Sequence, residues 1–455
     1  MGFFHLRPNL TDPHAKAIWS TYQQLDRSQW QSPAEIESFQ LERLGVLLKH
    51  CFENVPYYTR VLGDLGYPNR TIQSMDEFRR IPLMSRKLYQ ENMDDLLARK
   101  LPPGIVAGSK GAYTSGTNGV PVKVLKTNLD ILWWNALYMR DLEWGGFHPS
   151  GTLAAIRFIA FSKEELQPAL NGLALPYWKK FLHVLMENGP SFGMDVRQDP
   201  RRQIEWLNIV KPDYLIGMPS NMEFVAGLLI ESGQKIPGLR MIQSLGEPLD
   251  EPARRKIEAA FGAPVKNMYC SAEAGYVASP CPSGHGLHVH GESVITEVLD
   301  EHNHPCAPGQ TGRLVCTSLH NLISPFIRYD ILDEVTLADG PCPCGRGLQL
   351  WKHVDGRRQP MLYLANSRRK ICSGLLRGAR LAGGLLQFQI IQKAVDQVVV
   401  RVVPDKTWSN ENADKMRQVM WDEFEWKIPV KIEVVPRIPP GPGGKVRLIA
   451  VEVKE

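Results

Sequence analysis

The 455-residue sequence has no strong excess of charge of either sign and no long hydrophobic run. Its formal net charge of +5 is spread over the whole chain, which is too dilute to predict a nucleic acid or an anionic membrane surface as a partner. No apolar run approaches the roughly 20 residues of a membrane-spanning helix. The N-terminal stretch MGFFHLRPNLTDPHAK lacks a basic region followed by an apolar core, so we expect no signal peptide and a cytoplasmic location.

Cysteine is also sparse, and the sequence contains neither an internal repeat nor a low-complexity tract. The eight cysteines are irregularly spaced in a long chain without a predicted export signal. This pattern favours reduced thiols or a metal site over a disulfide framework. Five cysteines are expected to be unpaired: Cys51, Cys270, Cys306, Cys316 and Cys372.

The composition is that of a globular protein, with 43% hydrophobic and 22% charged residues. The length suggests two or three domains. Residues 1–100 have helical patterns, and Ser32-Pro33-Ala34-Glu35 predicts a capped helix start. From 150 to 320, short apolar runs alternate with helical patterns, which predicts an α/β fold with a mainly parallel sheet. Strands are expected at 153–161, 213–217, 241–245 and 265–269, and helices at 181–187, 221–232 and 251–261.

A domain boundary is expected at residues 354–357. It divides the chain into an N-terminal domain of residues 1–355 and a C-terminal domain of residues 356–455. The second part has its own pattern, with a strand at 395–403, a helix at 412–424 and a strand at 429–435. This pattern and size predict a small α+β domain.

One loop, Thr114-Ser115-Gly116-Thr117-Asn118-Gly119-Val120-Pro121, combines hydroxyl side chains with glycines. Glycine lets backbone N–H groups approach an anion closely, and consecutive N–H groups can form a concave phosphate site. The loop does not have the Walker A pattern, which requires a lysine after its second glycine. On its own this composition favours a surface turn.

Several stretches that follow this loop in the sequence help to interpret it. Residues 243–249 are QSLGEPL, residues 269–275 are YCSAEAG, residues 325–333 are PFIRYDILD, and Gly356-Arg357 and Lys445 follow. In this order, the motifs resemble those of the adenylate-forming (acyl-activating) enzymes, and specifically the phenylacetate–CoA ligase family. The sequence looks nearest to the branch of that family found in capsular-polysaccharide and secondary-metabolite contexts, and the resemblance extends from residues 44–58 to Lys445.

The resemblance implies a large N-terminal adenylate-forming domain and a small, mobile C-terminal domain that carries a catalytic lysine. It implies that the loop at 114–119 holds the β- and γ-phosphates of ATP, that one loop lines the adenine pocket and that Tyr269 stacks on the adenine ring. The phosphate loop supplies Thr114, Ser115, Gly116, Thr117 and Gly119, and the adenine loop supplies Gly246, Glu247 and Pro248.

The same resemblance implies the charged groups of the site. Asp333 would accept hydrogen bonds from the ribose hydroxyls, and Arg328 and Arg357 would bind phosphate or ribose. Glu273 would bind Mg²⁺, a hard cation that prefers carboxylate and phosphate oxygens. Lys445 would stabilise the charge that develops between the carboxylate and the α-phosphate.

The implied reaction uses ATP and Mg²⁺ to convert a small-molecule carboxylic acid to an acyl-adenylate, which then passes to coenzyme A (CoA). This phosphoryl-type step needs positioning and charge neutralisation rather than a nucleophilic side chain. The C-terminal domain is expected to rotate about a hinge near Gly356-Arg357 between the two steps. Dimers are common in the resembled family, so a homodimer is one expectation.

Two departures from the family pattern leave the acceptor open. Ala272 stands where a third hydroxyl residue is expected, and Gln359-Pro360 stands where the hinge usually carries an acidic residue. Acyl transfer to an amine or a hydroxyl without CoA is therefore an alternative. A non-catalytic nucleotide-binding protein is a second alternative, against which the presence of Lys445, Glu273 and Asp333 argues.

A second constellation combines Cys281 and His288 with the pair Cys342 and Cys344. Thiolates and an imidazole in a set of four suit tetrahedral zinc, and four filled ligand positions indicate a structural ion. Some members of the resembled family carry such a set and bind a structural zinc. His285 is an alternative fourth ligand, and unrelated reduced cysteines are the simpler alternative.

The acyl pocket is the part of the site that the sequence specifies least. Aromatic side chains at helical spacing are more often core than pocket. An aromatic acid fits the family resemblance, but fatty, indolic and amino-acid carboxylates fit as well. The candidate pocket residues are Trp133, Trp134, Phe158, Phe161 and the segment 218–221.

Overall fold

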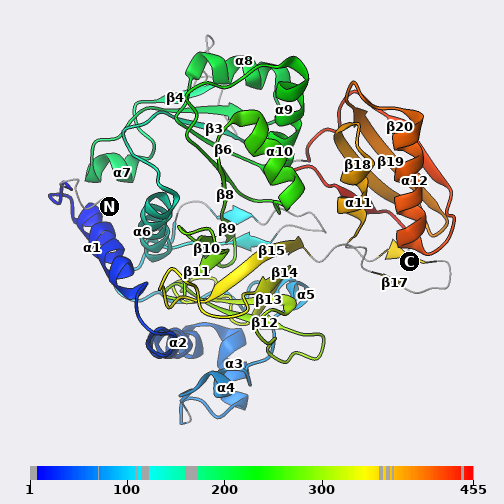
Figure 1. The fold of residues 1–455 in the computed structure, drawn as a ribbon. Coiled ribbons are helices and arrows are strands. Elements are labelled where there is room, and N and C mark those ends of the chain that lie inside the picture. The colour runs from blue at the N-terminus through cyan, green and yellow to red at the C-terminus, as the bar shows by residue number, and fades with distance from the viewer. Residues whose placement is uncertain are drawn as a thin grey trace. The chain divides into compact units, whose positions relative to one another are not determined.

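The computed structural model describes residues 8–69, 71–108, 111–113, 122–158, 172–357, 362–364, 369–370, 374–441 and 445–453. The chain forms two compact units (Figure 1). Unit one comprises Met1–Pro149, Lys179–Asn188 and Met268–Arg357, and unit two comprises Ser150–Trp178, Gly189–Asn267 and Arg358–Glu455. The predicted division at 355/356 stays a proposal. No helix in the described part of the chain is long and apolar enough to cross a membrane.

Unit one begins with helices whose starts are encoded locally. Ser32 and Glu35 form the predicted capping box at the start of α2, with proline at its first position. Thr127 and Asp130 cap α6 in the same way, and Gly146 ends it at φ +74°. The helices of unit one are α1 (Pro13–Ser28), α2 (Pro33–Asn54), α3 (Pro56–Asp64), α4 (Met75–Phe78), α5 (Arg86–Glu91), α6 (Asn128–Gly145) and α7 (Lys180–Leu185).

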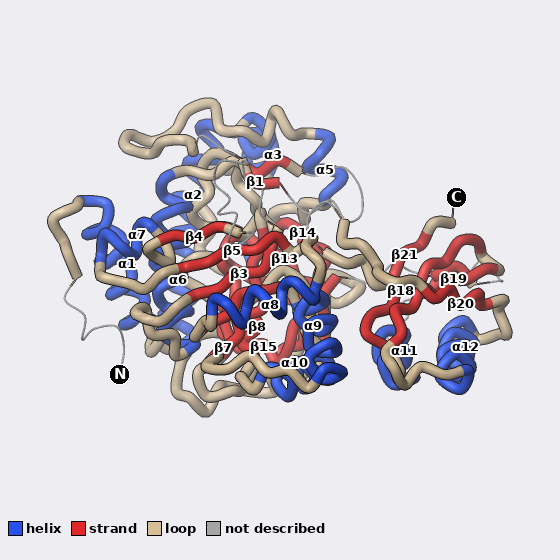
Figure 2. Tube along the Cα trace, turned by 90° about the horizontal axis from the view of Figure 1, so that it is seen from above, coloured by secondary structure: helices blue, strands red, loops and turns tan. Residues whose placement is uncertain are grey.

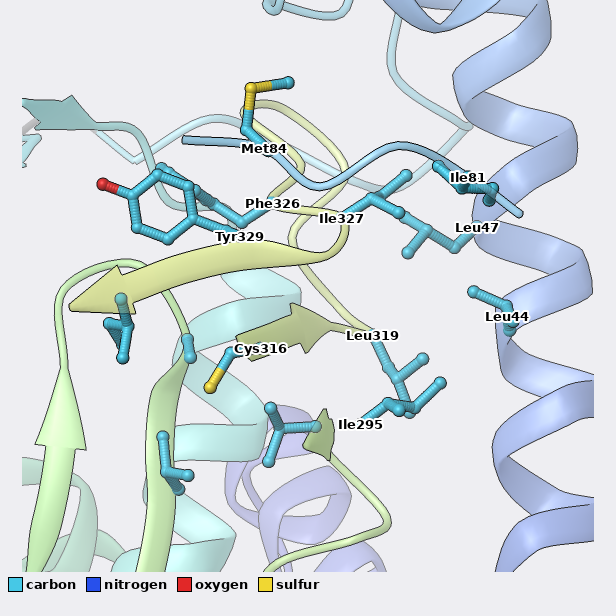
Figure 3. Close-up of a cluster of buried hydrophobic side chains, with 14 of the residues drawn as sticks. Leu44, Leu47, Ile81, Met84, Ile295, Cys316, Leu319, Phe326, Ile327 and Tyr329 are labelled. Carbon is cyan, nitrogen blue, oxygen red and sulfur yellow. The ribbon is translucent and has the colours of Figure 1, made fainter. Parts of the chain in front are cut away.

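The main sheet of unit one is antiparallel and has the strand order β12-β13-β14-β15-β11-β10-β9. Its strands are β9 (Tyr269–Ser271), β10 (Gly275–Pro280), β11 (Leu287–Val289), β12 (Val294–Leu299), β13 (Thr311–Ser318), β14 (Tyr329–Leu337) and β15 (Leu350–Arg357), and a separate two-stranded sheet joins β1 (Ala112–Tyr113) to β2 (Lys123–Val124). Leu44 and Leu47 point from α2 into a core that includes Leu319 and Ile327 (Figure 3).

The main sheet of unit two has the order β4-β5-β3-β6-β7-β8, in which every pairing except β4 with β5 is parallel. The prediction of a mainly parallel sheet is confirmed here, but it does not extend to the antiparallel sheet of unit one. The elements are β3 (Leu153–Arg157), β4 (Leu173–Leu175), β5 (Ser191–Asp195), α8 (Pro200–Val210), β6 (Tyr214–Gly217), α9 (Pro219–Ser232), β7 (Met241–Ser244), α10 (Glu251–Phe261) and β8 (Val265–Asn267).

The C-terminal part of unit two is the predicted α+β domain. Its four-stranded sheet has the order β20-β19-β18-β21 and carries α11 and α12 on one face (Figure 2). Its elements are β16 (Leu362–Tyr363), β17 (Arg369–Lys370), α11 (Gly374–Ala382), β18 (Leu385–Ala394), β19 (Gln397–Pro404), α12 (Asn410–Phe424), β20 (Val430–Val434) and β21 (Ile449–Val451). Leu386, Val403 and Ile438 extend the core of the parallel sheet into this part of unit two.

Candidate active site

Two of the predicted nucleotide-binding residues meet in unit one. Tyr269 lies on β9 and Asp333 on β14, and the phenolic hydroxyl of Tyr269 donates a hydrogen bond to Oδ2 of Asp333. Burial raises the pKa of Tyr269 well above its ordinary value, and the Asp333 carboxylate raises it further. The phenol therefore stays protonated and holds the carboxylate in place. The ring of Tyr269 also packs edge-on against Trp351, with centroids 5.8 Å apart.

Glu273 follows β9 and is 6% exposed. It lies within a tight turn in which the hydroxyl of Ser271 accepts a hydrogen bond from the backbone N–H of Ala274 at 2.9 Å. Burial raises the pKa of Tyr89 and Tyr329, and the charge of Glu273 raises both pKa values further. A buried carboxylate of this kind is a suitable oxygen ligand for a divalent cation.

Arg328 is not arranged as the nucleotide ligand that we predicted. It is 5% exposed, and its Nε and Nη2 donate to the two carboxylate oxygens of Glu297, each at 2.9 Å. Its Nη1 donates to the carbonyl oxygens of Arg79 and Ile81. These contacts assign Arg328 to an internal ion pair, a common arrangement for a buried guanidinium because its donors must be satisfied.

In unit two, Lys445 meets the predicted adenine loop although the two are far apart in the sequence. A Cβ atom on Gly246 would lie 3.5 Å from Cε and 3.8 Å from Nζ of Lys445. Gly246 also has φ +81°, which side chains other than glycine rarely adopt. The conformation therefore favours glycine at this position, and the lysine lies within van der Waals distance of where a Cβ atom would be.

Glu247, the next residue of this loop, accepts a hydrogen bond at Oε2 from the backbone N–H of Ser220 at 2.9 Å. Burial raises the pKa of Glu247, whereas the hydrogen bonds from Ser220 and the charge of Lys445 oppose that shift. Pro248 follows in the same loop. Two predicted elements of the site, the adenine loop and the catalytic lysine, are thus neighbours within unit two.

Some predicted site residues lie outside the described part of the chain. These are the whole phosphate loop (Thr114, Ser115, Gly116, Thr117 and Gly119), the pocket candidate Phe161, the hinge residues Gln359 and Pro360, and Cys372. The side chain of Arg357 is also outside it, although the backbone register of β14 and β15 pairs Arg357 with Asp333. Their roles stay predictions.

A cavity of about 150 Å³ lies in unit one. Trp133 and Trp134 of α6 line it, as expected for the acyl pocket, and so do Ala274 and Gly275, which directly follow Glu273. The remaining lining residues are Lys126, Asp130, Ile131, Leu137, Tyr276, Ser293, Ser318 and His320. Phe158, another candidate, is 38% exposed in unit two, and Arg197 lies over its ring.

Helix α6 is fixed by buried polar contacts that support this cavity. Arg140, on α6, donates to the two carboxylate oxygens of Glu292 at 2.8 and 3.1 Å, and both side chains are at most 3% exposed. Ser28 donates to the same carboxylate at 2.5 Å. The hydroxyl of Tyr276 donates to Asp141 of α6 at 2.8 Å, which orients the tyrosine ring at the cavity.

The predicted metal ligands also converge in unit one. One ligand atom from each of Cys281, His288, Cys342 and Cys344 lies within 4.8 Å of the others. The sulfurs of Cys281 and Cys342 are 3.7 Å apart, and Nε2 of His288 is 3.2 Å from Sγ of Cys344. Tetrahedral zinc with Zn–S bonds of about 2.3 Å separates two sulfurs by about 3.8 Å.

The histidine of this cluster has the orientation that a metal ligand needs. Nδ1 of His288 donates to the carbonyl of Leu348 at 3.3 Å, which leaves the lone pair of Nε2 toward the three sulfurs. Within the described residues, His288 belongs to the cluster and His285 does not. The set fits a structural zinc ion.

Comparisons with known proteins agree with this arrangement. Residues 112–322 match the family described as AMP-binding enzyme, and residues 365–452 match the CapK C-terminal domain. These matches support an adenylate-forming enzyme. Among such enzymes the chain is phenylacetate–CoA ligase-like and near CapK.

Individual relatives of this adenylate-forming enzyme cover most of its length. Phenylacetate-coenzyme A ligase of Escherichia coli is 24% identical over 356 residues, which is 76% of each chain. Protein CapK of Staphylococcus aureus is 24% identical over 434 residues, 92% of this chain and 90% of CapK. A solved 2-hydroxyisobutyryl-CoA ligase with 19% identity has a TM-score of 0.71, covering 93% of this chain and 91% of that one, which confirms the fold.

Sequence reasoning missed part of the cavity of this adenylate-forming enzyme. Lys126, Tyr276 and His320 were not among the candidates, because they come from three distant stretches of sequence. The internal partner of Arg328 was missed for the same reason. Tyr276 directly follows the motif at 269–275, and this proximity was the one available signal.

Proposed function

We propose that this enzyme uses ATP to activate a carboxylic acid as an acyl-adenylate and then transfers the acyl group to CoA. The observation that carries the proposal is the contact of Lys445 with the loop of Gly246 and Glu247. The names of the relatives support the same reaction, since they include phenylacetate-coenzyme A ligases. The cavity beside Glu273 would hold the acyl group.

In the first step, a carboxylate oxygen attacks the α-phosphorus of ATP and pyrophosphate leaves. Negative charge accumulates between two anions, and the ammonium group of Lys445 would offset it. Glu273 would hold Mg²⁺, which neutralises the phosphates. Asp333, oriented by Tyr269, would accept hydrogen bonds from the ribose hydroxyls. Positioning and charge supply the catalysis, so no nucleophilic side chain is required.

In the second step, the sulfur of CoA attacks the acyl carbonyl and AMP leaves. The acceptor is left open by two departures from the family pattern, Ala272 and Gln359-Pro360, and the second of these lies outside the described residues. The solved relatives include a CoA complex, which favours the thiol. The Cys281–His288–Cys342–Cys344 cluster would bind zinc in a structural role. A homodimer and a cytoplasmic location stay predictions.

Exchange of labelled pyrophosphate into ATP, measured across a panel of carboxylic acids, tests the first step. We expect acid-dependent exchange, followed by AMP release that requires CoA. Exchange without CoA-dependent AMP release would favour an amine or hydroxyl acceptor. Absence of exchange with every acid, in protein that binds ATP, would refute the proposed function.

A further inference from the structure

The residues that line the cavity in unit one are of two chemical kinds, aromatic or apolar and polar or charged. Trp133, Trp134, Leu137 and Tyr276 supply apolar and aromatic surface. Its volume of about 150 Å³ corresponds to a single ring, since a protein cavity of roughly this size holds one benzene molecule. Trp134 is 40% exposed, so this wall also borders the opening to solvent.

The charged residues of the cavity neutralise each other. Nζ of Lys126 is 3.7 Å from Oδ1 of Asp130. Asp130 is held in place at the same time, because its Oδ2 accepts hydrogen bonds from the backbone N–H and the hydroxyl of Thr127, both at 2.8 Å. The pair leaves no unmatched charge in the wall, so the cavity has no counterion for a second charged group on the acid.

His320 lines the cavity, and its ring is held in a fixed orientation. Its ring stacks on Trp133, with centroids 3.9 Å apart and planes 12° apart. Its Nε2 lies 3.1 Å from the carbonyl oxygen of Glu292 and must therefore be the protonated nitrogen. Burial lowers the pKa of His320 to about 3, so the ring is neutral at pH 7 and Nδ1 carries a lone pair.

Nδ1 of His320 has no hydrogen-bond donor among the described residues. The nearby cavity residues Ser293 and Ser318 also have hydroxyls without a partner in the described part of the chain. None of these atoms is both fully buried and without a partner in the described part of the chain, so water in the cavity can reach them. A bound acid that displaces this water must satisfy them, because an unsatisfied buried polar atom is costly. A substrate that brings a donor would satisfy the acceptor, whereas an unsubstituted ring would displace water from it without replacement.

We propose that the cavity selects a single-ring aromatic carboxylic acid that carries a hydroxyl or amino group, which donates a hydrogen bond to Nδ1 of His320. This inference rests on the proposed function, in which the cavity holds the acyl group. The aromatic wall accepts the ring, and the paired Lys126 and Asp130 exclude a second charge. His320 is then a specificity residue rather than a group that takes part in the chemistry.

The test compares matched acids with and without the donor. Pyrophosphate exchange is measured for benzoate, its hydroxy and amino derivatives, phenylacetate and its hydroxy derivatives, hexanoate and succinate. For the wild-type enzyme we expect the best donor-bearing acid to exceed its unsubstituted parent at least about tenfold in kcat/KM, the size of effect that an unmet buried acceptor produces. This comparison needs no variant.

The variant His320→Phe keeps an aromatic ring for stacking on Trp133 but removes the acceptor. We expect it to raise KM for the donor-bearing acid and to leave kcat/KM for the unsubstituted parent within about twofold, so that the preference disappears. His50→Phe is the matched control, because His50 is also buried in unit one and its Nε2 bonds a carbonyl, that of Leu322, at 2.8 Å, but it does not line the cavity. It should retain the wild-type preference.

Wild-type enzyme that activates unsubstituted rings, hexanoate or succinate as well as the donor-bearing acids would overturn the specificity while leaving the proposed function intact. An unchanged preference in His320→Phe would overturn the role of His320. Absence of exchange with every acid would instead refute the proposed function, and the specificity with it.

Discussion

Unit one contains two ion pairs in its interior beside several exposed ones, whereas the bridging arginine of unit two, Arg380, has partners that are partly open to water. Arg140 with Glu292 and Arg328 with Glu297 have side chains no more than 7% exposed, and each guanidinium also binds backbone carbonyls. Removing one partner of such a pair leaves an uncompensated buried charge. The interior pairs of unit one therefore fix the elements that carry Trp133 and Asp333.

In unit two, the bridging arginine and the predicted catalytic lysine are held in a different way. Arg380 bridges Glu223 and Asp250, whose side chains are 16% and 38% exposed, and it joins α11 to the parallel-sheet part of the unit. Lys445 reaches Gly246 from a loop near the end of the chain. The comparison teaches that Tyr269 and Asp333, two predicted binding residues, belong to one sheet, whereas the predicted catalytic lysine lies beside its loop through packing between distant parts of the sequence.

The two units also differ in their histidine content. The sequence contains 12 histidines, all at positions within unit one and none within unit two. Buried neutral histidines lose stability in acid because the unfolded chain gains protons that the folded chain cannot accept. A fall in pH should therefore destabilise unit one before it destabilises unit two.

The largest expected effect comes from breaking an interior pair. Arg140→Ala should lower the free energy of unfolding by about 3–5 kcal/mol, because Glu292 would remain buried without its counter-charge. Denaturant unfolding followed by circular dichroism measures this change. Arg255→Ala, which removes an exposed pair with Glu251, should cost less than about 1 kcal/mol. Equal effects of the two variants would remove the distinction between interior and surface pairs.

The metal cluster of unit one should give the next effect. Purified protein is expected to contain one zinc per chain, and zinc present at 100 times its dissociation constant would stabilise by about 2.7 kcal/mol. Cys342→Ser should lose the metal and lower the melting temperature, whereas Cys306→Ser, which lies outside the cluster, should retain both. Metal-free wild-type protein of unchanged stability would contradict the zinc assignment.

A pH titration gives a slightly smaller effect. Folding lowers the pKa of His320 from 6.5 to about 3, chiefly through burial. Below pH 6.5 the unfolded state binds a proton that the folded state does not, so stability falls as the pH falls. At pH 5 this group alone should cost about 2 kcal/mol relative to pH 8. Denaturant unfolding at pH 5 and at pH 8 measures the loss of unfolding free energy. We expect this loss to be about 2 kcal/mol smaller in His320→Phe than in wild type. Identical losses in the two proteins would contradict the prediction.

The smallest effect is expected in unit two. Arg380→Ala should reduce stability by only about 1–2 kcal/mol, because its partners are partly solvated. The same variant should free the C-terminal part of the unit and increase its hydrogen exchange. A loss as large as that of Arg140→Ala would show that unit two depends on interior charge as strongly as unit one does.

Local features of the fold were predictable because their causes are local. The capping box at Ser32 and the parallel sheet of unit two follow from adjacent residues and from the alternation of apolar runs. The antiparallel pairing of β9 to β15 was not predicted, because strand periodicity is the same for both directions of pairing. Only turns and long-range contacts decide between them.

The candidate site likewise contains residues that the sequence predicted and residues that it did not. Motif order predicted Tyr269, Glu273, Asp333 and Lys445, and the structure brings Tyr269 to Asp333 and Lys445 to Gly246. The ion pair of Arg328 with Glu297 was not foreseen, because a motif does not reveal that its guanidinium will be buried. His320 was missed because its role depends on burial and on a stacking partner distant in the sequence.

The most direct test of the central claim measures pyrophosphate exchange and ATP binding together in Lys445→Ala. The account predicts that exchange falls by about 10²–10³-fold, the usual cost of one lost transition-state contact, while ATP binding and the fold are retained. Lys431→Ala, which removes a lysine paired with Glu433 on β20 of the same unit, should exchange normally. Near-normal exchange in Lys445→Ala would contradict the assignment of the reaction to this site.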